Sequence, residues 1–263
     1  ASERVLPRLA LDFTTGVLDS RVTITRALNT ATRVNSSGYI ETVNANLPRF
    51  SYDAITLAPK GLLIEEARVN SMTYSEDMST WTTSGASVST NQVTSPNNTL
   101  TADALIEDSA TSEHLAFSNA VNITSAGYVS QSIFIRANGR NAQVRMQGSN
   151  AFAYIITNVD LSNSTYSTPA TYLASNATVT IEPYKESFYR VTITGVFDAS
   201  ITSVRTYVYL LSGGVGGATN YLGNGTSGVY LWGAQIEAAA FATSYIPNLA
   251  TGTTTRNADQ AAM

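Results

Sequence analysis

The sequence contains no cysteine and a single histidine, and few of its residues carry charge. Without cysteine, disulfide bonds and thiolate metal sites are excluded, so stability must come from packing or from oligomerisation. Because His114 is the only histidine, a Ser-His-Asp triad would have to use it, and zinc sites built from several histidines are excluded. His114 lies where a strand is expected to begin, a setting more typical of a structural residue than of a catalytic base.

Charged residues make up only 13% of the 263 residues, about half of the usual ~25% in soluble domains. Serine, threonine, asparagine and glycine take their place, as they do in many virion β-proteins and in any chain of short strands and turns. The net charge of −4 argues against a nucleic-acid partner, which would require a basic face. No apolar run reaches the roughly 20 residues of a membrane-spanning helix, so no membrane partner is expected.

Alternating apolar and polar residues predict β-strands through most of the chain. The runs at 128–136 and 143–147 flank Asn138-Gly139-Arg140, which predicts a hairpin. Further alternating runs cover 177–183, 189–197, 204–211 and 228–237, with turns between them at the spacing of a sandwich or barrel. Helical signals are limited to one turn at 75–81. The sequence therefore predicts an all-β protein.

Three regions are expected along the chain. Residues 1–50 have short alternating runs of their own and predict a small N-terminal β appendage or linker. Residues 51–250 are expected to form the main β-sandwich, and residues 251–263 a polar C-terminal extension. Within the sandwich, we expect the segments around Ile64 and around Leu231 to lie side by side as interior strands.

Catalysis by paired carboxylates is the enzymatic option that the composition leaves open, because glycoside hydrolysis needs only two acids flanking one bond. Glu65 and Glu66 cannot form such a pair on a strand, since adjacent side chains point to opposite faces. Any pair would have to be assembled across strands. We expect no catalytic residues and no enzymatic activity.

Acids and arginines stand at both ends of the expected sandwich. Arg68 or Arg256 is expected to pair with Glu65 or Glu237 and so to lock the closing strands. A structural calcium ion, held by such carboxylates and backbone carbonyls, is the one cofactor that stays open. Trp81 and Trp232 lie within apolar patterns and are expected in the core.

The 14 tyrosines suggest a ligand site, because sugars stack their C–H faces on aromatic rings and bind amides through their hydroxyls. Tyr207 and Tyr209 share one face of an expected strand. Tyr221 and Asn224 lie in the glycine-rich connection 212–228 that follows. These four residues are the candidate ligand-binding residues. The alternative is that the tyrosines are ordinary half-buried sheet residues and the connection a mobile loop.

Several short sequence motifs, each present once, lie in order along nearly the whole chain. They are Leu11-Asp12-Phe13, Pro48-Arg49-Phe50, the Gly-Leu-Leu-Ile-Glu-Glu-Ala-Arg of 61–68, Tyr74-Ser75-Glu76, Trp81, the Trp-Gly-Ala-Gln-Ile-Glu of 232–237, the Thr-Ser-Tyr-Ile-Pro of 243–247 and the Thr-Arg-Asn-Ala-Asp of 255–259. With these strings the chain resembles bacteriophage head-spike, tail-fibre and related virion proteins. Their modules resemble carbohydrate-binding β-sandwiches of the jelly-roll type.

The resemblance implies a jelly-roll-like antiparallel β-sandwich in a virion. It implies a non-enzymatic fibre or spike protein that binds host-surface glycans, contacts other virion proteins and forms a homotrimer. The shared strings, including Gln235, would be framework, and residues 1–50 would serve virion attachment. Two alternatives stay open: a capsid-decorating or connector protein without glycan binding, and a glycan depolymerase.

Overall fold

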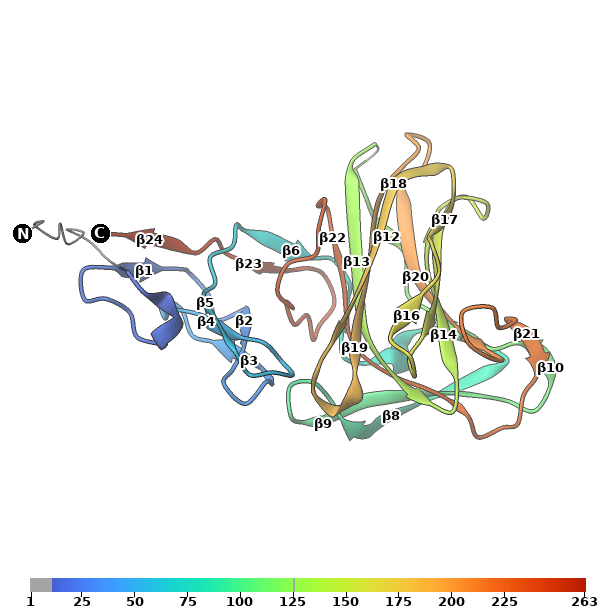
Figure 1. Ribbon diagram of the computed structural model, residues 1–263. Helices are drawn as coiled ribbons and strands as arrows, with labels where there is room; N and C mark the ends of the chain where they lie inside the picture. The colour runs from blue at the N-terminus through green and yellow to red at the C-terminus, as the bar shows by residue number, and fades with distance from the viewer. Residues whose placement is uncertain (1–10, 125) are drawn as a thin grey trace, which may run out of the picture.

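The computed structural model describes residues 11–124 and 126–263, which form a β-sandwich at one end of the molecule and a small β lobe at the other (Figure 1). The first ten residues of the predicted appendage lie outside the described residues. None of the helices in the described part of the chain has the length and apolar character needed to cross a bilayer. All are single 3₁₀ turns: η1 (Phe13–Thr15), η2 (Met78–Thr80) and η3 (Lys185–Ser187).

The sandwich consists of a larger sheet of eight strands and a smaller sheet of six. The larger sheet runs β16-β15-β14-β20-β11-β7, with β12 beside β20 and β17 beside β15. Its strands are β7 (Thr82–Ser84), β11 (Leu115–Phe117), β12 (Val121–Asn122), β14 (Asn141–Gly148), β15 (Tyr154–Asp160), β16 (Thr165–Tyr166), β17 (Ala170–Tyr172) and β20 (Ser203–Leu211).

The smaller sheet runs β18-β19-β13-β22-β9-β8. Its strands are β8 (Ala86–Thr94), β9 (Leu100–Glu107), β13 (Tyr128–Asn138), β18 (Ala174–Pro183), β19 (Tyr189–Phe197) and β22 (Gly228–Glu237). A separate ribbon pairs β10 (Thr111–Glu113) with β21 (Asn220–Leu222). The chain crosses repeatedly between the two sheets, and their strand pairs are antiparallel. This arrangement confirms the predicted jelly-roll-like sandwich.

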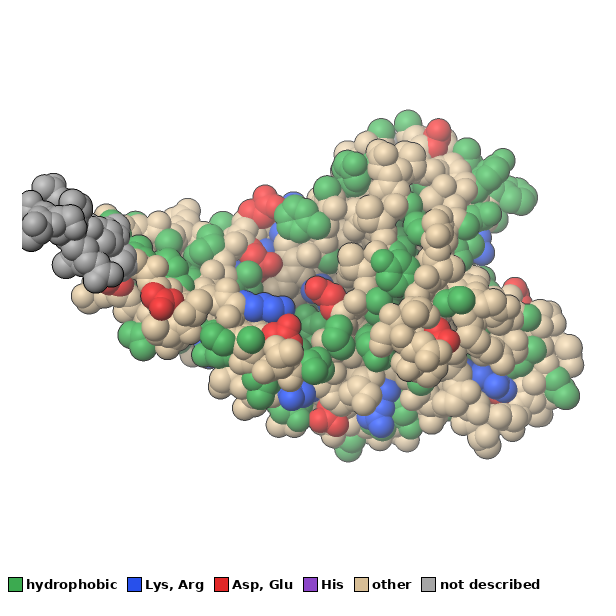
Figure 2. Space-filling model, viewed as in Figure 1, with side chains coloured by type: hydrophobic (Ala, Val, Ile, Leu, Met, Phe, Trp, Pro, Cys, Tyr) green, Lys and Arg blue, Asp and Glu red, His purple; other side chains and the backbone are tan. Residues whose placement is uncertain are grey.

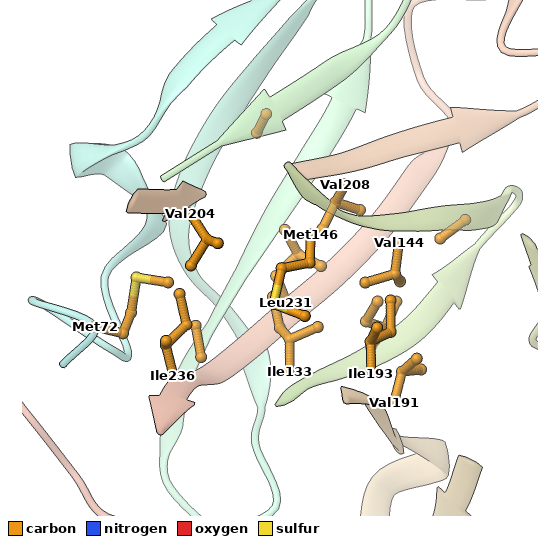
Figure 3. Close-up of a cluster of buried hydrophobic side chains, with 14 of the residues drawn as sticks. Met72, Ile133, Val144, Met146, Val191, Ile193, Val204, Val208, Leu231 and Ile236 are labelled. Atoms are coloured by element: carbon orange, nitrogen blue, oxygen red, sulfur yellow. The ribbon is translucent and has the colours of Figure 1, made fainter. Parts of the chain in front are cut away.

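The main core lies between the two sheets, and alternation explains which side chains fill it. Val144 and Met146 of β14 and Val208 of β20 point toward Ile133 and Leu231 of the smaller sheet (Figure 3). All five are fully buried. The neighbouring residues of β14 and β20, which have the opposite parity, point outward. The apolar face of each strand is therefore fixed by the core, and the outward face is free to carry function.

The small lobe is made of four two-stranded pairs and extends beyond the predicted boundary at residue 50. The pairs are β1 (Thr23–Thr25) with β24 (Gln260–Ala262), β2 (Ala31–Val34) with β3 (Ile40–Val43), β4 (Phe50–Tyr52) with β5 (Pro59–Leu62), and β6 (Arg68–Asn70) with β23 (Thr254–Arg256). The residues 251–263 expected as an extension thus complete this lobe.

The expectation that the segments around Ile64 and Leu231 are neighbouring interior strands is wrong. Leu231 lies in β22, but Ile64 is 46% exposed in an irregular segment of the small lobe between β5 and β6. The physical reason is that Glu65, next to Ile64, turns toward buried arginines instead of entering a ladder. The small lobe is hydrogen-bonded to β22 next to β6, where Ser71 N–H donates to the carbonyl of Ile236 at 2.9 Å.

A second apolar cluster joins the two parts of the molecule on the outer face of the smaller sheet. Trp232, Phe134 and Tyr245 pack there with Ile40 of the small lobe. The Trp232 ring centroid lies 5.2 Å from that of Phe134 and 4.7 Å from that of Tyr245. Trp232 is fully buried and Trp81 is 6% exposed, as expected of core tryptophans.

A buried ionic network holds the small lobe together. Asp259 pairs with Arg26 at 2.6 Å and with Arg49, whose side chain also lies 2.7 Å from Glu65. Arg256 pairs with Glu65 at 2.9 Å, which is one of the pairings expected from the sequence. Burial alone would raise the pKa of Asp259, but the hydrogen bonds from Arg49 and Arg26 outweigh it and lower the pKa.

The other framework residues lie close to this network. Glu237 accepts hydrogen bonds from Thr243 N–H at 2.9 Å and from its hydroxyl at 2.7 Å. Gln235 accepts a bond from Ile246 N–H at 2.7 Å and donates to Glu237. Arg68 does not pair with Glu65 or Glu237 as expected, because it points to the surface and pairs with Glu66.

Candidate functional site

The outward face of the larger sheet carries the strongest candidate for a functional site. The register places Arg145 of β14 opposite Tyr207 of β20, and Tyr207 opposite Phe117 of β11. The next row pairs Gln147 with Arg205. Directly opposed residues share one face of a sheet, so these side chains from three strands form one continuous surface.

Three aromatic rings on this face form a stacked row. The rings of Phe117 and Tyr207 have centroids 4.6 Å apart and planes inclined by 15°. The rings of Tyr207 and Tyr209 have centroids 6.0 Å apart and planes inclined by 17°. Phe117 and Tyr207 are half-buried, whereas Tyr209 is 8% exposed. We call these three residues the aromatic row. Because each ring packs against its neighbour, the row is held rigidly on the sheet.

Two arginines flank the aromatic row. The Arg145 guanidinium carbon lies 4.7 Å from the Tyr154 ring centroid, and that of Arg205 lies 5.5 Å from the Phe117 ring centroid. Arg145 also donates to the carbonyl of Ala151 at 3.3 Å. Neither guanidinium forms an ion pair with a carboxylate in residues 11–124 or 126–263. Most of their hydrogen-bonding capacity is therefore free for a ligand.

A cavity of about 480 Å³ opens between the arginines and the aromatic row. This volume falls within the range of about 300–1,000 Å³ that is typical of small-ligand sites. The cavity is lined by Ala120, Arg145, Gln147, Gly148, Ser149, Ala151, Ser203, Arg205, Tyr207 and Tyr209, so none of its described lining residues is a carboxylate. Its wall at 149–152 is fixed because Gln147 donates to the carbonyls of Asn150 and Ala151 at 3.0 and 2.7 Å.

The electrostatics of the cavity follow from this lining. Burial raises the pKa of Tyr209, and the nearby Arg145 guanidinium offsets part of that rise. The phenol therefore stays protonated at neutral pH and can donate a hydrogen bond. The cavity offers hydroxyl donors, one amide and two cations.

The other two candidate ligand residues lie elsewhere. Tyr221 of β21 donates to Glu107 at 2.6 Å, and Asn224 N–H donates to the same carboxylate at 2.8 Å. Arg140 holds Glu107 through two bonds of 2.7 Å. Burial raises the pKa of Glu107, but the bonds from Arg140, Tyr221 and Asn224 outweigh it and lower the pKa to about 2. Tyr221 and Asn224 thus complete a structural cluster, whereas Tyr207 and Tyr209 line the cavity.

The glycine-rich connection reaches the far end of the outward face. Asn158 of β15 donates to the carbonyl of Val215 at 2.6 Å, and Gln143 donates to Asn158 at 2.9 Å. The glycine-rich connection is therefore hydrogen-bonded to the larger sheet at Val215.

The described part of the chain has no cluster of metal-binding side chains. No group of three or more His, Cys, Asp or Glu side chains in residues 11–124 and 126–263 is arranged to hold an ion. His114 is fully buried, with Nδ1 2.5 Å from the carbonyl of Gly85 and Nε2 3.2 Å from that of Tyr221. In the view of Figure 2, charged side chains are sparse, and several acidic and basic side chains lie next to one another.

Of the residues at this candidate site, the sequence prediction named Tyr207 and Tyr209 but not Phe117, Arg145, Arg205 or Gln147. Arg145 and Gln147 occupy the polar positions of the alternating run 143–147, and Arg205 precedes Tyr207 by two residues on the same strand face. That parity was a usable signal. The order of the strands in the sheet could not be predicted from the sequence, because β11, β14 and β20 come from distant parts of the chain.

No protein-family model matches the chain, and no curated protein matches it. Among solved structures, the chain is similar to the enzymatically active domain of tailspike protein 4 of bacteriophage CBA120, with 12% identity and a TM-score of 0.37. It is also similar to the CBM22-1–GH10 modules of Clostridium thermocellum xylanase 10B, which were complexed with xylohexaose, with 11% identity and a TM-score of 0.39. A third structure is the mannan-recognising carbohydrate-binding module TmCBM27, with 11% identity and a TM-score of 0.33.

The matches cover 64%, 70% and 67% of this chain, in the same order. They cover 21% of the tailspike chain, 30% of the xylanase chain and 98% of TmCBM27. The chain therefore spans less than a third of the first two structures. Likenesses this remote assign no function to the chain.

Proposed function

We propose that the protein is a carbohydrate-binding module and that the aromatic row with its adjoining cavity is the glycan site. The observation that carries the proposal is the row itself, three rings in register on one sheet face beside a cavity of about 480 Å³. A sugar ring stacks its C–H face on such rings, while donors at the edge bind its hydroxyls. Tyr209 and the two arginines supply those donors.

The site is also suited to binding because it is preorganised. Its side chains stand on strands of a packed sandwich, and hydrogen bonds from Gln147 hold the wall of the cavity. A rigid site loses little conformational entropy when a ligand binds. Weak sugar contacts can therefore add up to useful affinity.

We further propose that the module is non-enzymatic and belongs to a virion fibre or spike that binds host-surface glycans. The sequence resemblance supports the virion setting. Glycoside hydrolysis would need two carboxylates roughly 5–9.5 Å apart at the ligand. The described cavity lining has none, and Glu65 and Glu237 are engaged in the framework of the small lobe.

The test measures the binding of wild type, Tyr207→Ala and Tyr166→Ala to a broad glycan array. The glycan that wild type binds most tightly is then titrated into each protein by calorimetry. Tyr207→Ala should weaken binding at least about tenfold, because a stacking surface is lost. Tyr166→Ala is the matched control, since Tyr166 is 42% exposed on β16 and lies outside the cavity. Equal affinities of wild type and Tyr207→Ala, or silence of wild type across the array, would contradict the proposal.

A capsid-decorating or connector role is the second candidate, and the position of the small lobe favours it. β1 pairs with β24, so the two ends of the described chain lie together in that lobe (Figure 1). In this role the lobe would attach the sandwich to another virion protein. This role would be favoured if wild type binds no glycan while virions with Tyr207→Ala assemble and infect normally.

We also propose that the chain forms a homotrimer, as its resemblance to fibre and spike proteins implies. Light scattering on the purified protein tests this directly. A mass near that of one 28.0 kDa chain at micromolar concentration would contradict it.

A further inference from the structure

We propose that the glycan bound at this cavity is acidic and that Arg145 and Arg205 bind its anionic group. This inference rests on the proposed function and narrows its ligand to sugars that carry a carboxylate or a sulfate ester. It comes from the charges at the cavity, which the stacking of neutral sugars does not require.

The two arginines are unusual in this chain because they lack carboxylate partners. The other described arginines mostly form ion pairs, namely Arg21, Arg26, Arg33, Arg49, Arg68, Arg140 and Arg256. Of the remaining described arginines, Arg190 donates to Ser132 and Arg136 stacks on Tyr230, both away from the cavity. With a net charge of −4, the protein nevertheless leaves two cations together in one cavity.

The geometry places both cations beside one ring of the aromatic row. Arg145 is directly opposite Tyr207, and Arg205 precedes Tyr207 by two residues on β20. Diagonal neighbours of this kind have Cβ atoms about 7 Å apart, and both arginine side chains line the same cavity. A sugar stacked on Tyr207 would carry that group at its edge.

The arginines are also held in place before any ligand arrives. Arg145 stacks on Tyr154 and Arg205 on Phe117, which restricts both flexible side chains. A planar guanidinium binds a carboxylate or a sulfate through two parallel hydrogen bonds. A neutral sugar would leave both charges without a counterion in the cavity, whereas an acidic sugar neutralises them.

The experiment uses matched probes that differ only in charge. Wild type is titrated with oligogalacturonate and with the same oligosaccharide after its carboxyls are reduced to alcohols. A heparin-derived oligosaccharide and its desulfated form provide the sulfate arm, and oligosialate with its carboxyl-reduced form adds a second carboxylate arm. Each acidic probe that binds is then titrated against Arg145→Gln, Arg205→Gln and the control Arg136→Gln. The control removes one positive charge from a stacked arginine outside the cavity.

We expect at least one acidic probe to bind about ten times more tightly than its neutral form, with affinity that falls as salt rises. Arg145→Gln and Arg205→Gln should each weaken that binding about tenfold or more, and Arg136→Gln should not. Neutral glycans should lose clearly less affinity than acidic ones when Arg145 or Arg205 is replaced, and a thermal unfolding scan shows whether each variant is folded.

Three outcomes would overturn the inference. They are equal binding of the neutral and acidic forms, unchanged binding by the two cavity variants, and no binding of any acidic probe. If neutral glycans still bind and Tyr207→Ala abolishes that binding, the proposed function stands and only the acidic specificity falls. If Tyr207→Ala has no effect either, both fall.

Discussion

At the residue scale, the small lobe depends on charged side chains where a larger domain would use apolar ones. Arg26, Arg49, Arg256 and Asp259 are buried there, and the side chains of Arg49 and Asp259 are 0% and 1% exposed. Buried ions are tolerated only when they are paired and hydrogen-bonded. Asp259 satisfies two arginines at once and also accepts the N–H of Glu65 at 3.0 Å. It therefore links Arg26, Arg49 and the backbone of Glu65 in one network.

Asp259→Asn should lower the free energy of unfolding by about 3–5 kcal/mol, because it leaves buried arginines without their counterion. Urea unfolding, followed by circular dichroism, measures the change. Asp19→Asn is the matched control, since Asp19 pairs with Arg21 at the surface and should leave the midpoint unchanged. Similar midpoints for both variants would show that the ionic network does not stabilise the protein.

At the element scale, β22 shows how one glycine lets a strand serve two cores. The register between β13 and β22 shifts between Ser132 and Phe134, where β22 has an extra residue. Gly233 sits at this bulge with φ of +62°. As a result Leu231 and Ala234 both face the main core, whereas Trp232 faces the second cluster.

Gly233→Ala should lower the free energy of unfolding by about 2 kcal/mol or more. Its Cβ would meet Cδ2 of Phe134 at 2.8 Å, and its φ lies in the left-handed region. Gly216→Ala is the control, because a Cβ there would have no neighbour within 4 Å. Thermal unfolding of the two variants shows whether the bulge requires glycine at position 233. Equal unfolding midpoints for the two variants would contradict this requirement.

The Glu107 cluster makes a pH-dependent connection between β9 and β21. The folded pKa of Glu107 is lowered to about 2, so its ionised form stabilises the fold above the unfolded pKa of about 4.3. That stabilisation is lost as the pH falls from about 4.3 toward about 2. The unfolding midpoint of Glu107→Gln should therefore lie well below that of wild type at pH 7, and the gap should narrow as acid is added. A gap that is constant with pH would exclude this linkage.

The sequence predicted the positions of strands along the chain far better than it predicted which strands pair with each other. Periodicity placed β19 and β22 at their observed bounds, 189–197 and 228–237, because each has one face in a core. The positions of Ile64 and of residues 251–263 in the small lobe could not be predicted from the sequence. The nearby strands β6, β23 and β24 have three residues each, which is too short to show a periodic pattern. Tyr221 was assigned to the ligand site because its partner Glu107 lies 114 residues away in the sequence.

At the scale of the whole molecule, the proposed site and the paired strands β1 and β24 lie in different parts. The aromatic row belongs to the larger sheet of the sandwich, whereas β1 and β24 lie in the small lobe at the opposite end (Figure 1). The second apolar cluster, which includes Ile40 and Trp232, connects these parts. In the proposed role, the lobe would be the attachment point and the sandwich would present the glycan site.

A crystal structure with the tightest-binding glycan of the array is the most direct test of the carbohydrate site. The account predicts a sugar ring stacked on Tyr207, with its polar substituents directed to Arg145 and Arg205. Sugar density elsewhere, such as in the hollow between Tyr52 and Tyr184, with the aromatic row left bare, would contradict it.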